Sequence, residues 1–418
     1  MSGHSKNLIA LIAIQGSNAS LPLLVFPYAL SMLGSASYAD LVFAEALSFL
    51  AIAIVLYSFE IDGVADVAGL SVERDRSRIS RVFSRVLYTR LCLFFLAAPV
   101  LVVAIACYRP ELGELAAWWM LVPLSYALQP TWMFQGLQHN TAPAICTLLS
   151  RFAAVMLVLL LVVGPEDTLL LPQIIGLSYI GGSLAQIAWA IIRLKFRLMS
   201  ISCKEMLACI KTGKEIFLGN IGVVLYRDSN VLLLGLVGLA GVELAAYSLA
   251  EKITKAMQAV IRPLNQLFFP RAVLAVRAVG AANLDALSAL FRLTWPQLLA
   301  LAFAWGGLYL IIQLGMTYFA QGTRILELHA IISLAAIMSL ATFFGVGNFM
   351  FGSAGLNILG ERRVMLYCIL LAAATSVGST IILGSLFGAM GAALSLVLAE
   401  GFLCLLIIQY YMRSAARR

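Results

Sequence analysis

Apolar stretches of about 20 residues recur along the whole chain. A helix of that length crosses the hydrocarbon core of a bilayer, which is roughly 30 Å thick. Strands of a membrane barrel would alternate apolar and polar residues, and runs such as 157–163 (LVLLLVV) do not alternate. The pattern therefore predicts about twelve transmembrane helices, over residues 7–33, 38–62, 86–108, 117–138, 142–164, 169–193, 214–237, 242–269, 292–314, 327–351, 363–384 and 388–412.

The segments between these helices are too short to hold a soluble domain. A polar loop at residues 194–213 falls at the chain midpoint and divides the helices six and six. Each half also carries an Ala-Glu pair in its second span, at Ala44-Glu45 and Ala250-Glu251, which favours an internal repeat. We therefore predict an all-α polytopic membrane protein with two six-helix lobes, residues 1–200 and 201–418.

Composition and charge also restrict the class of protein and its partners. Of the 418 residues 62% are hydrophobic and 11% charged, and the mean hydropathy is +0.97, which excludes a water-soluble globule. With both termini in the cytoplasm, 22 basic residues fall on the cytoplasmic side and only Arg109 and Arg324 on the other. This asymmetry is a positive-inside signal, so the net charge of +8 requires no nucleic-acid partner.

The eighth span carries charged residues near its centre, where contact with lipid is energetically unfavourable. At 100° per residue, its polar side chains share an arc of about 140° that includes Glu251, Lys252, Lys255 and Arg262. Each charge at the centre of a span costs roughly 2.5–3.5 kcal/mol against lipid. We therefore expect this stripe to line an aqueous cavity, although interhelical ion pairs that only fix the packing are the alternative interpretation.

Other spans add polar residues to the same prediction. The seventh span carries Asn220, Arg227 and Asn230 within about 80° of arc, with Asp228 pointing roughly 100° away. The expected substrate-binding residues are Arg227, Lys252, Lys255, Arg262, Asn220 and Asn230. The expected residues for charge balance or for a coupling ion are Glu45, Glu251, Glu400 and Asp228.

The cations of the stripe outnumber its carboxylates, which suits an anionic ligand such as a phosphate, a pyrophosphate or an acidic sugar. Aromatic residues near the cavity ends would stack on sugar rings or, as is more common, pack between helices; these are Tyr28, Trp132, Phe134, Tyr226 and Tyr247.

Sequence motifs for enzyme chemistry are incomplete. The run Thr212-Gly213-Lys214 lacks the earlier glycine and the following Ser/Thr of a phosphate-binding loop. The three histidines are far apart and the seven cysteines lack metal-ligand spacing, so we expect no metal site. No catalytic triad or carboxylate pair is evident. We expect no enzyme and no cofactor, with a proton or sodium gradient as the candidate energy source.

Several motifs resemble the Wzx-type polysaccharide flippases, in the superfamily that also holds the multidrug and toxin extrusion (MATE) transporters. Residues 22–28 (PLLVFPY), with Leu33-Gly34 and Tyr38, look like the opening of the family, and residues 132–138 (WMFQGLQ) are similar to its fourth-span signature. The most specific match comprises 217–220 (FLGN), Tyr226, Ser229-Asn230, 247–253 (YSLAEKI), Pro263 and 269–271 (FPR). Spans 9–12 match mainly by hydropathy.

The resemblance implies two six-helix lobes forming a V around a cationic cavity. It also implies transport of an undecaprenyl-pyrophosphate-linked oligosaccharide across the bacterial inner membrane, for O-antigen, capsule or exopolysaccharide assembly. A glycan polymerase and chain-length proteins would be partners. One departure matters: the family often has an arginine before an acidic residue after the second span, where this chain has Ala65-Asp66, so no role of that arginine carries over.

Three other functions are weighed against this one. A drug antiporter of the same superfamily would favour an anionic cavity, which the surplus of cations argues against. A membrane-embedded glycan polymerase or ligase would present a sizeable outer loop with arginines or histidines, and the outer loops predicted here are short. A purely structural scaffold would leave the charged stripe unexplained.

Overall fold

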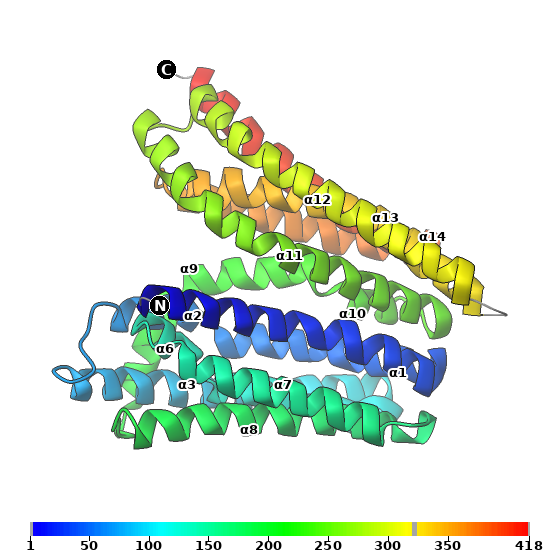
Figure 1. Ribbon diagram of the computed structural model, residues 1–418, viewed down its shortest axis with the longest axis horizontal. Helices are drawn as coiled ribbons and strands as arrows, with labels where there is room; N and C mark the ends of the chain where they lie inside the picture. The colour runs from blue at the N-terminus through cyan, green and yellow to red at the C-terminus, as the bar shows by residue number, and fades with distance from the viewer. Residues whose placement is uncertain (1–2, 320–323, 417–418) are drawn as a thin grey trace. The chain divides into compact units, whose positions relative to one another are not determined.

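The computed structural model describes residues 3–319 and 324–416, except for the side chains of residues 3–21, 260, 262, 263, 266, 267, 312, 314–319, 324–327 and 416. This part of the chain is helical, with short connections and no strand. It folds as two compact units, Met1–Val224 and Leu225–Arg418. The predicted all-α membrane fold is confirmed (Figure 1).

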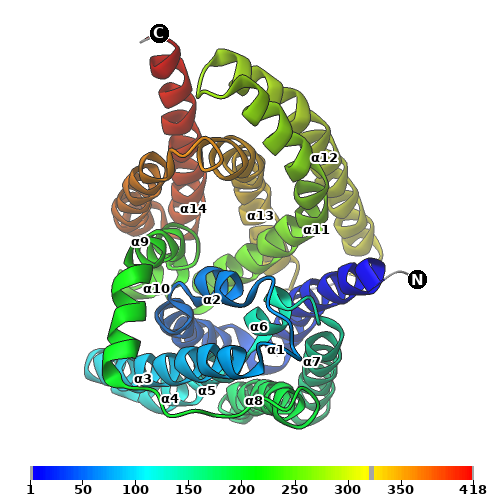
Figure 2. The same cartoon turned by 90° about the vertical axis from the view of Figure 1, so that its left-hand side faces the viewer.

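In the first unit the long helices lie side by side (Figure 2). Helix α1 packs against α3, α5 and α7, while α8 packs against α5 and α7. Two short helices, α2 and α6, pack on each other at one end of the unit. The elements are α1 Gly3–Leu56, α2 Phe59–Val67, α3 Arg76–Tyr108, η1 Pro110–Leu112, α4 Gly113–Trp119, α5 Leu121–Leu128, α6 Thr131–Gly136, α7 Thr141–Leu161, η2 Pro165–Thr168, α8 Leu170–Ile192 and α9 Cys203–Arg227.

In the second unit α11 is the central helix. It packs against α12 and α13, α13 packs against α14, and α10 packs against α14. The elements are α10 Asn230–Leu236, α11 Gly241–Val279, α12 Leu284–Phe319, α13 Arg324–Gly347, the π-helix η3 Asn348–Leu356 and α14 Arg362–Ala416.

Single glycines join predicted spans into continuous helices. Gly34 (φ 75°) interrupts α1, and Gly388 (φ 58°) interrupts α14. A positive φ is strained for residues with a β-carbon, so glycine allows the chain to kink there without a loop. Each of these helices therefore contains two predicted spans.

The predicted number of twelve spans is not confirmed. Seven described helices are long and apolar enough to cross a membrane, or eight if α9 and α10, bent by 60°, form one span. Two of the seven are the kinked helices α1 and α14, each of which contains two predicted spans. The predicted span 117–138 is divided among α4, α5 and α6, and the polar stripe of α11 lowers the apolar character of that helix.

The boundary between the units lies within α9, not in the loop at residues 194–213. Most of α9 is tied to the first unit by three polar contacts. The Tyr57 hydroxyl donates to the Ile210 carbonyl at 2.7 Å, and the Asn220 amide donates to the Tyr57 carbonyl at 2.7 Å. Arg81 and Glu205 form an ion pair of 3.1 Å. Sequence pattern alone does not reveal these tertiary contacts.

The fourth-span signature is a packing element. Trp132 and Phe134 of α6 are buried, at 1% and 0% exposure. The Trp132 ring lies against Gly63 of α2, where an added β-carbon would meet it at 2.7 Å. Tyr226 and Tyr247 are also buried, and the Tyr28 hydroxyl donates to the Val162 carbonyl. The packing interpretation of these aromatic residues therefore holds in this structure.

Candidate functional site

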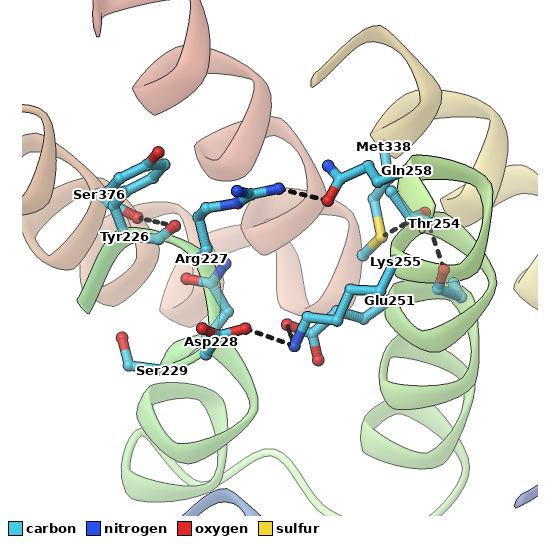
Figure 3. A network of polar contacts seen from close by, with 12 residues as sticks. Tyr226, Arg227, Asp228, Ser229, Glu251, Thr254, Lys255, Gln258, Met338 and Ser376 are labelled. Carbon is cyan, nitrogen blue, oxygen red and sulfur yellow. Dashed lines mark hydrogen bonds and ion pairs between the residues drawn. The ribbon is translucent and has the colours of Figure 1, made fainter. Parts of the chain in front are cut away.

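The charged stripe of α11 forms a cluster inside the second unit (Figure 3). Lys255 and Glu251 are one turn apart on α11, and their side chains lie 3.2 Å apart. The Lys255 amine also lies 2.8 Å from a carboxylate oxygen of Asp228. One lysine is thus held between two carboxylates from different elements.

Asp228 reaches this cluster because α9 ends at Arg227. On a continuous helix Asp228 would point away from Arg227, as the sequence predicted. The chain instead bends by 60° between α9 and α10. The bend allows Arg227 and Asp228 to contact neighbouring positions of α11, Gln258 and Lys255.

Arg227 links α9 to two other helices. Its guanidinium donates to the side-chain oxygen of Gln258 on α11. Its Nε lies 3.5 Å from an oxygen of Glu400 on α14. The other oxygen of Glu400 accepts a hydrogen bond of 2.7 Å from the amide of Asn348. Glu400 is therefore held between an arginine and an amide in a buried position.

Asn348 begins a π-helix of nine residues, Asn348–Leu356. Such segments are rare, and they frequently occur at functional sites. The Asn348 amide also donates to the backbone carbonyl of Glu400 at 3.0 Å. The π-helix thus lies where the polar cluster meets the packing of α13 on α14.

A cavity of about 300 Å³ opens beside Arg227. Its polar lining comes from Arg227, Gln258, Asn265 and Thr342, and its apolar lining includes Phe349. The side chains of Arg227 and Lys255 are 32% and 33% exposed, whereas those of Glu400 and Glu251 are 1% and 5% exposed. The two cations are therefore more accessible than Glu400 and Glu251, whereas Asp228 is nearly as exposed as Lys255, at 28%.

The predicted surplus of positive charge is not seen among the described side chains. The cations Arg227, Lys252 and Lys255 stand against the carboxylates of Asp228, Glu251 and Glu400. Lys252 is buried, at 7% exposure. Arg262, the fourth predicted cation, has its side chain outside the description. The balance arises because Asp228 and Glu400 come from helices other than the stripe.

The structure does not bring all predicted residues together. Asn220 lies in the first unit, where it caps the break after α1 at Tyr57. Asn230 is fully buried and accepts a hydrogen bond of 3.0 Å from Thr380. Glu45 is buried in the first unit. Of the predicted residues with described side chains, Arg227, Lys255, Glu251, Glu400 and Asp228 join in the cluster, and Lys252 is buried beside Glu251 on the same helix.

Two buried arginines in the first unit were not predicted as site residues, because both were expected on the cytoplasmic side of the membrane. Arg90 of α3, 1% exposed, pairs with Glu60 at 2.7 Å and donates to the Gln129 carbonyl. Arg151 of α7, 5% exposed, lies over the ring of Tyr179. Their positions inside predicted spans were the signal that could have identified them.

Comparisons with known proteins agree with the resemblance read from the motifs. The chain matches the model of a family described as polysaccharide biosynthesis protein over residues 5–273. An Escherichia coli (strain K12) protein provisionally named an O-antigen transporter is 23% identical over 269 residues. That match covers 64% of this chain and only 64% of the relative's length.

Solved structures show the same fold. An inward-facing multidrug resistance MATE family transporter of the MOP superfamily matches with a TM-score of 0.65 and 16% identity, over 98% of both chains. The lipid II flippase MurJ, in an inward closed conformation, matches with a TM-score of 0.65 and 15% identity, over 97% of this chain and 87% of that one. At such low identities the likeness establishes the fold alone.

Proposed function

Because the chain belongs to the family of polysaccharide biosynthesis proteins, we propose that it is a flippase rather than an enzyme. Its substrate is an undecaprenyl-pyrophosphate-linked oligosaccharide. It carries this substrate from the cytoplasmic to the periplasmic leaflet of the bacterial inner membrane by alternating access, with both of its own termini in the cytoplasm. The glycan then enters O-antigen, capsule or exopolysaccharide assembly, where a polymerase and chain-length proteins are its partners.

The main support for this proposal is the cluster in the second unit, where partly exposed cations lie beside a cavity. Arg227 and Lys255 are about one-third exposed, and Arg227 lines a cavity of about 300 Å³. A guanidinium offers a fork of donors that fits phosphate oxygens, and an ammonium offers a mobile point charge. Buried groups that served packing alone would have no need to face an open cavity.

In the proposed cycle the pyrophosphate takes hydrogen bonds from cations that otherwise bind carboxylates. Arg227 turns from Glu400 and Gln258 to the ligand, and Lys255 turns from Asp228 and Glu251. Carboxylates left beside fewer cations favour uptake of a proton, so Glu251 and Glu400 are the proposed carriers of a coupling proton.

The drug antiporter remains the second candidate, because the fold is shared with MATE transporters. The charge argument against it is weaker than the sequence suggested, since the described cluster is balanced. Family membership, together with a relative provisionally named an O-antigen transporter, favours the glycan substrate.

Complementation of a strain that lacks its own glycan flippase tests the proposal. We expect Lys252→Ala with Lys255→Ala to abolish surface glycan relative to the amount of protein in the membrane, which is measured alongside because Asp228 and Glu251 lose the ion pair with Lys255. The matched control removes two exposed lysines of α9, Lys204→Ala with Lys211→Ala, and should retain surface glycan. Full surface glycan in the first double variant would refute the transport role of the cluster.

A further inference from the structure

An apolar groove lies among α11, α12 and α13 of the second unit, three helices that also contribute to the lining of the polar cavity. Its lining includes Ile253 of α11, Trp305, Gly306 and Tyr309 of α12, and Ile332 and Ala336 of α13. Its volume is about 240 Å³. Gly306 is exposed, and a β-carbon added there would meet nothing within 4 Å.

Trp305 connects the lining of the groove to the lining of the cavity. It lines the groove and packs against the cluster formed by Ile261, Leu301 and Val346, which also line the cavity. Its indole N–H donates to the hydroxyl of Thr342 at 3.0 Å, and Thr342 also lines the cavity. A single side chain thus faces an apolar site on one side and is hydrogen-bonded to the rim of a polar site on the other.

We propose that this groove holds a segment of the polyprenyl chain of the substrate while the pyrophosphate occupies the cavity beside Arg227. The inference rests on the proposed function and adds a binding site for the lipid part. Only a ligand with an anionic head joined to a long apolar chain would fill both sites at once. The groove is small, so most of the chain stays in the bilayer.

The order of the two sites along the helices fits this ligand. On α11, α12 and α13 alike, the groove residues lie farther from the predicted cytoplasmic end than the cavity residues do. A lipid in the cytoplasmic leaflet points its chain in that direction, toward the bilayer centre. Burial of its methylene groups against Trp305 and Ile332 would add affinity that the head alone lacks.

The test is photolabelling of the full-length protein in lipid nanodiscs. The probe is undecaprenyl phosphate with a diazirine on its chain, and mass spectrometry identifies the labelled peptides. We expect labels within residues 305–309 of α12 and 332–339 of α13. Filling the groove by Gly306→Leu should reduce this labelling about tenfold, because the leucine displaces several buried methylene groups.

Gly307→Leu is the matched control. Gly307 is the next residue of α12, is also exposed, would also place an added β-carbon in open space, and is not part of the groove lining. This variant should label like the wild type. Ala336→Leu fills the groove from α13 and should repeat the loss seen with Gly306→Leu. This second substitution keeps the test decisive if Gly306→Leu does not fold.

Two results would overturn the inference. One is unchanged labelling after the groove is filled from either side. The other is equal labelling by phosphatidylglycerol with a diazirine on its acyl chain, which would make the groove an ordinary lipid contact. The transport proposal is tested separately, by surface glycan in the lysine double variant. If photolabelling contradicts the groove but that variant lacks surface glycan, only the groove inference fails. If that variant keeps full surface glycan, the transport proposal fails.

Discussion

At the scale of single residues, charged side chains of the cluster in the second unit form ion pairs. Arg227 faces Glu400, and Lys255 lies between Asp228 and Glu251. Removing one member of a buried pair leaves an uncompensated charge and costs about 3–5 kcal/mol. Single substitutions therefore confound folding with function, and a neutral double substitution separates the two.

We predict that Arg227→Gln with Glu400→Gln leaves the protein folded but abolishes transport. The double change keeps the cluster neutral, so melting of the purified protein should stay close to that of the wild type. Surface glycan in the complemented strain should be lost, because no guanidinium remains to hold the phosphate. If the pair served only packing, surface glycan would instead be retained.

Asn348 gives a second prediction at this scale. Its amide donates to both the carboxylate and the backbone carbonyl of Glu400. Asn348→Leu leaves a buried carboxylate with one partner fewer, which costs about 1–3 kcal/mol. We expect a lower melting temperature in detergent than for Asn357→Leu, a change in the turn that follows the π-helix. Equal melting of the two variants would contradict the holding role of Asn348.

At the scale of elements, the signature residues of the fourth span explain how α6 is positioned. Gly136 of α6 lies so close to α2 that an added β-carbon would be 2.8 Å from the Val64 carbonyl oxygen. Trp132 of the same helix packs on Gly63 of α2. Small residues at both crossings allow the two backbones to approach closely.

Gly136→Leu should therefore destabilise the first unit by roughly 1–3 kcal/mol, as overpacking does elsewhere. A lower melting temperature of the purified protein is the expected result. Gly181→Leu is the control, since Gly181 of α8 is exposed and has open space around it. Similar melting temperatures for both variants would show that the close approach of α2 and α6 contributes little.

At the scale of the whole molecule, the basic residues predict the orientation in the membrane. Alkaline phosphatase folds only outside the cytoplasm, so its activity reports on which side a fused position lies. Fusion after Gly164, before the exposed turn η2, should give an active enzyme. Fusion after Gly360, before α14, should give an inactive one. The opposite pattern would invert the proposed topology.

The sequence predicted the class of fold because hydropathy acts over whole spans, and it identified the polar stripe of α11 because a helix has a fixed period. Hydropathy and periodicity do not predict which distant helices come into contact. Glu400 and Asp228 neutralise the stripe only because α14 and the bend after α9 bring them there. Asn348 belongs to a π-helix, which hydrophobic periodicity does not predict. Arg90 and Arg151 lie inside predicted spans, so their burial could have been predicted.

The paired charges beside the cavity have a consequence for release. Asp228, Glu251 and Glu400 compete with any incoming phosphate for the same cations. When the ligand dissociates, these carboxylates pair with the cations again, so the empty transporter carries no unpaired positive charge at the cluster. A receptor can bind its ligand tightly, whereas a transporter must release it on the other side of the membrane. Carboxylates that compete for the cations of the binding site favour that release.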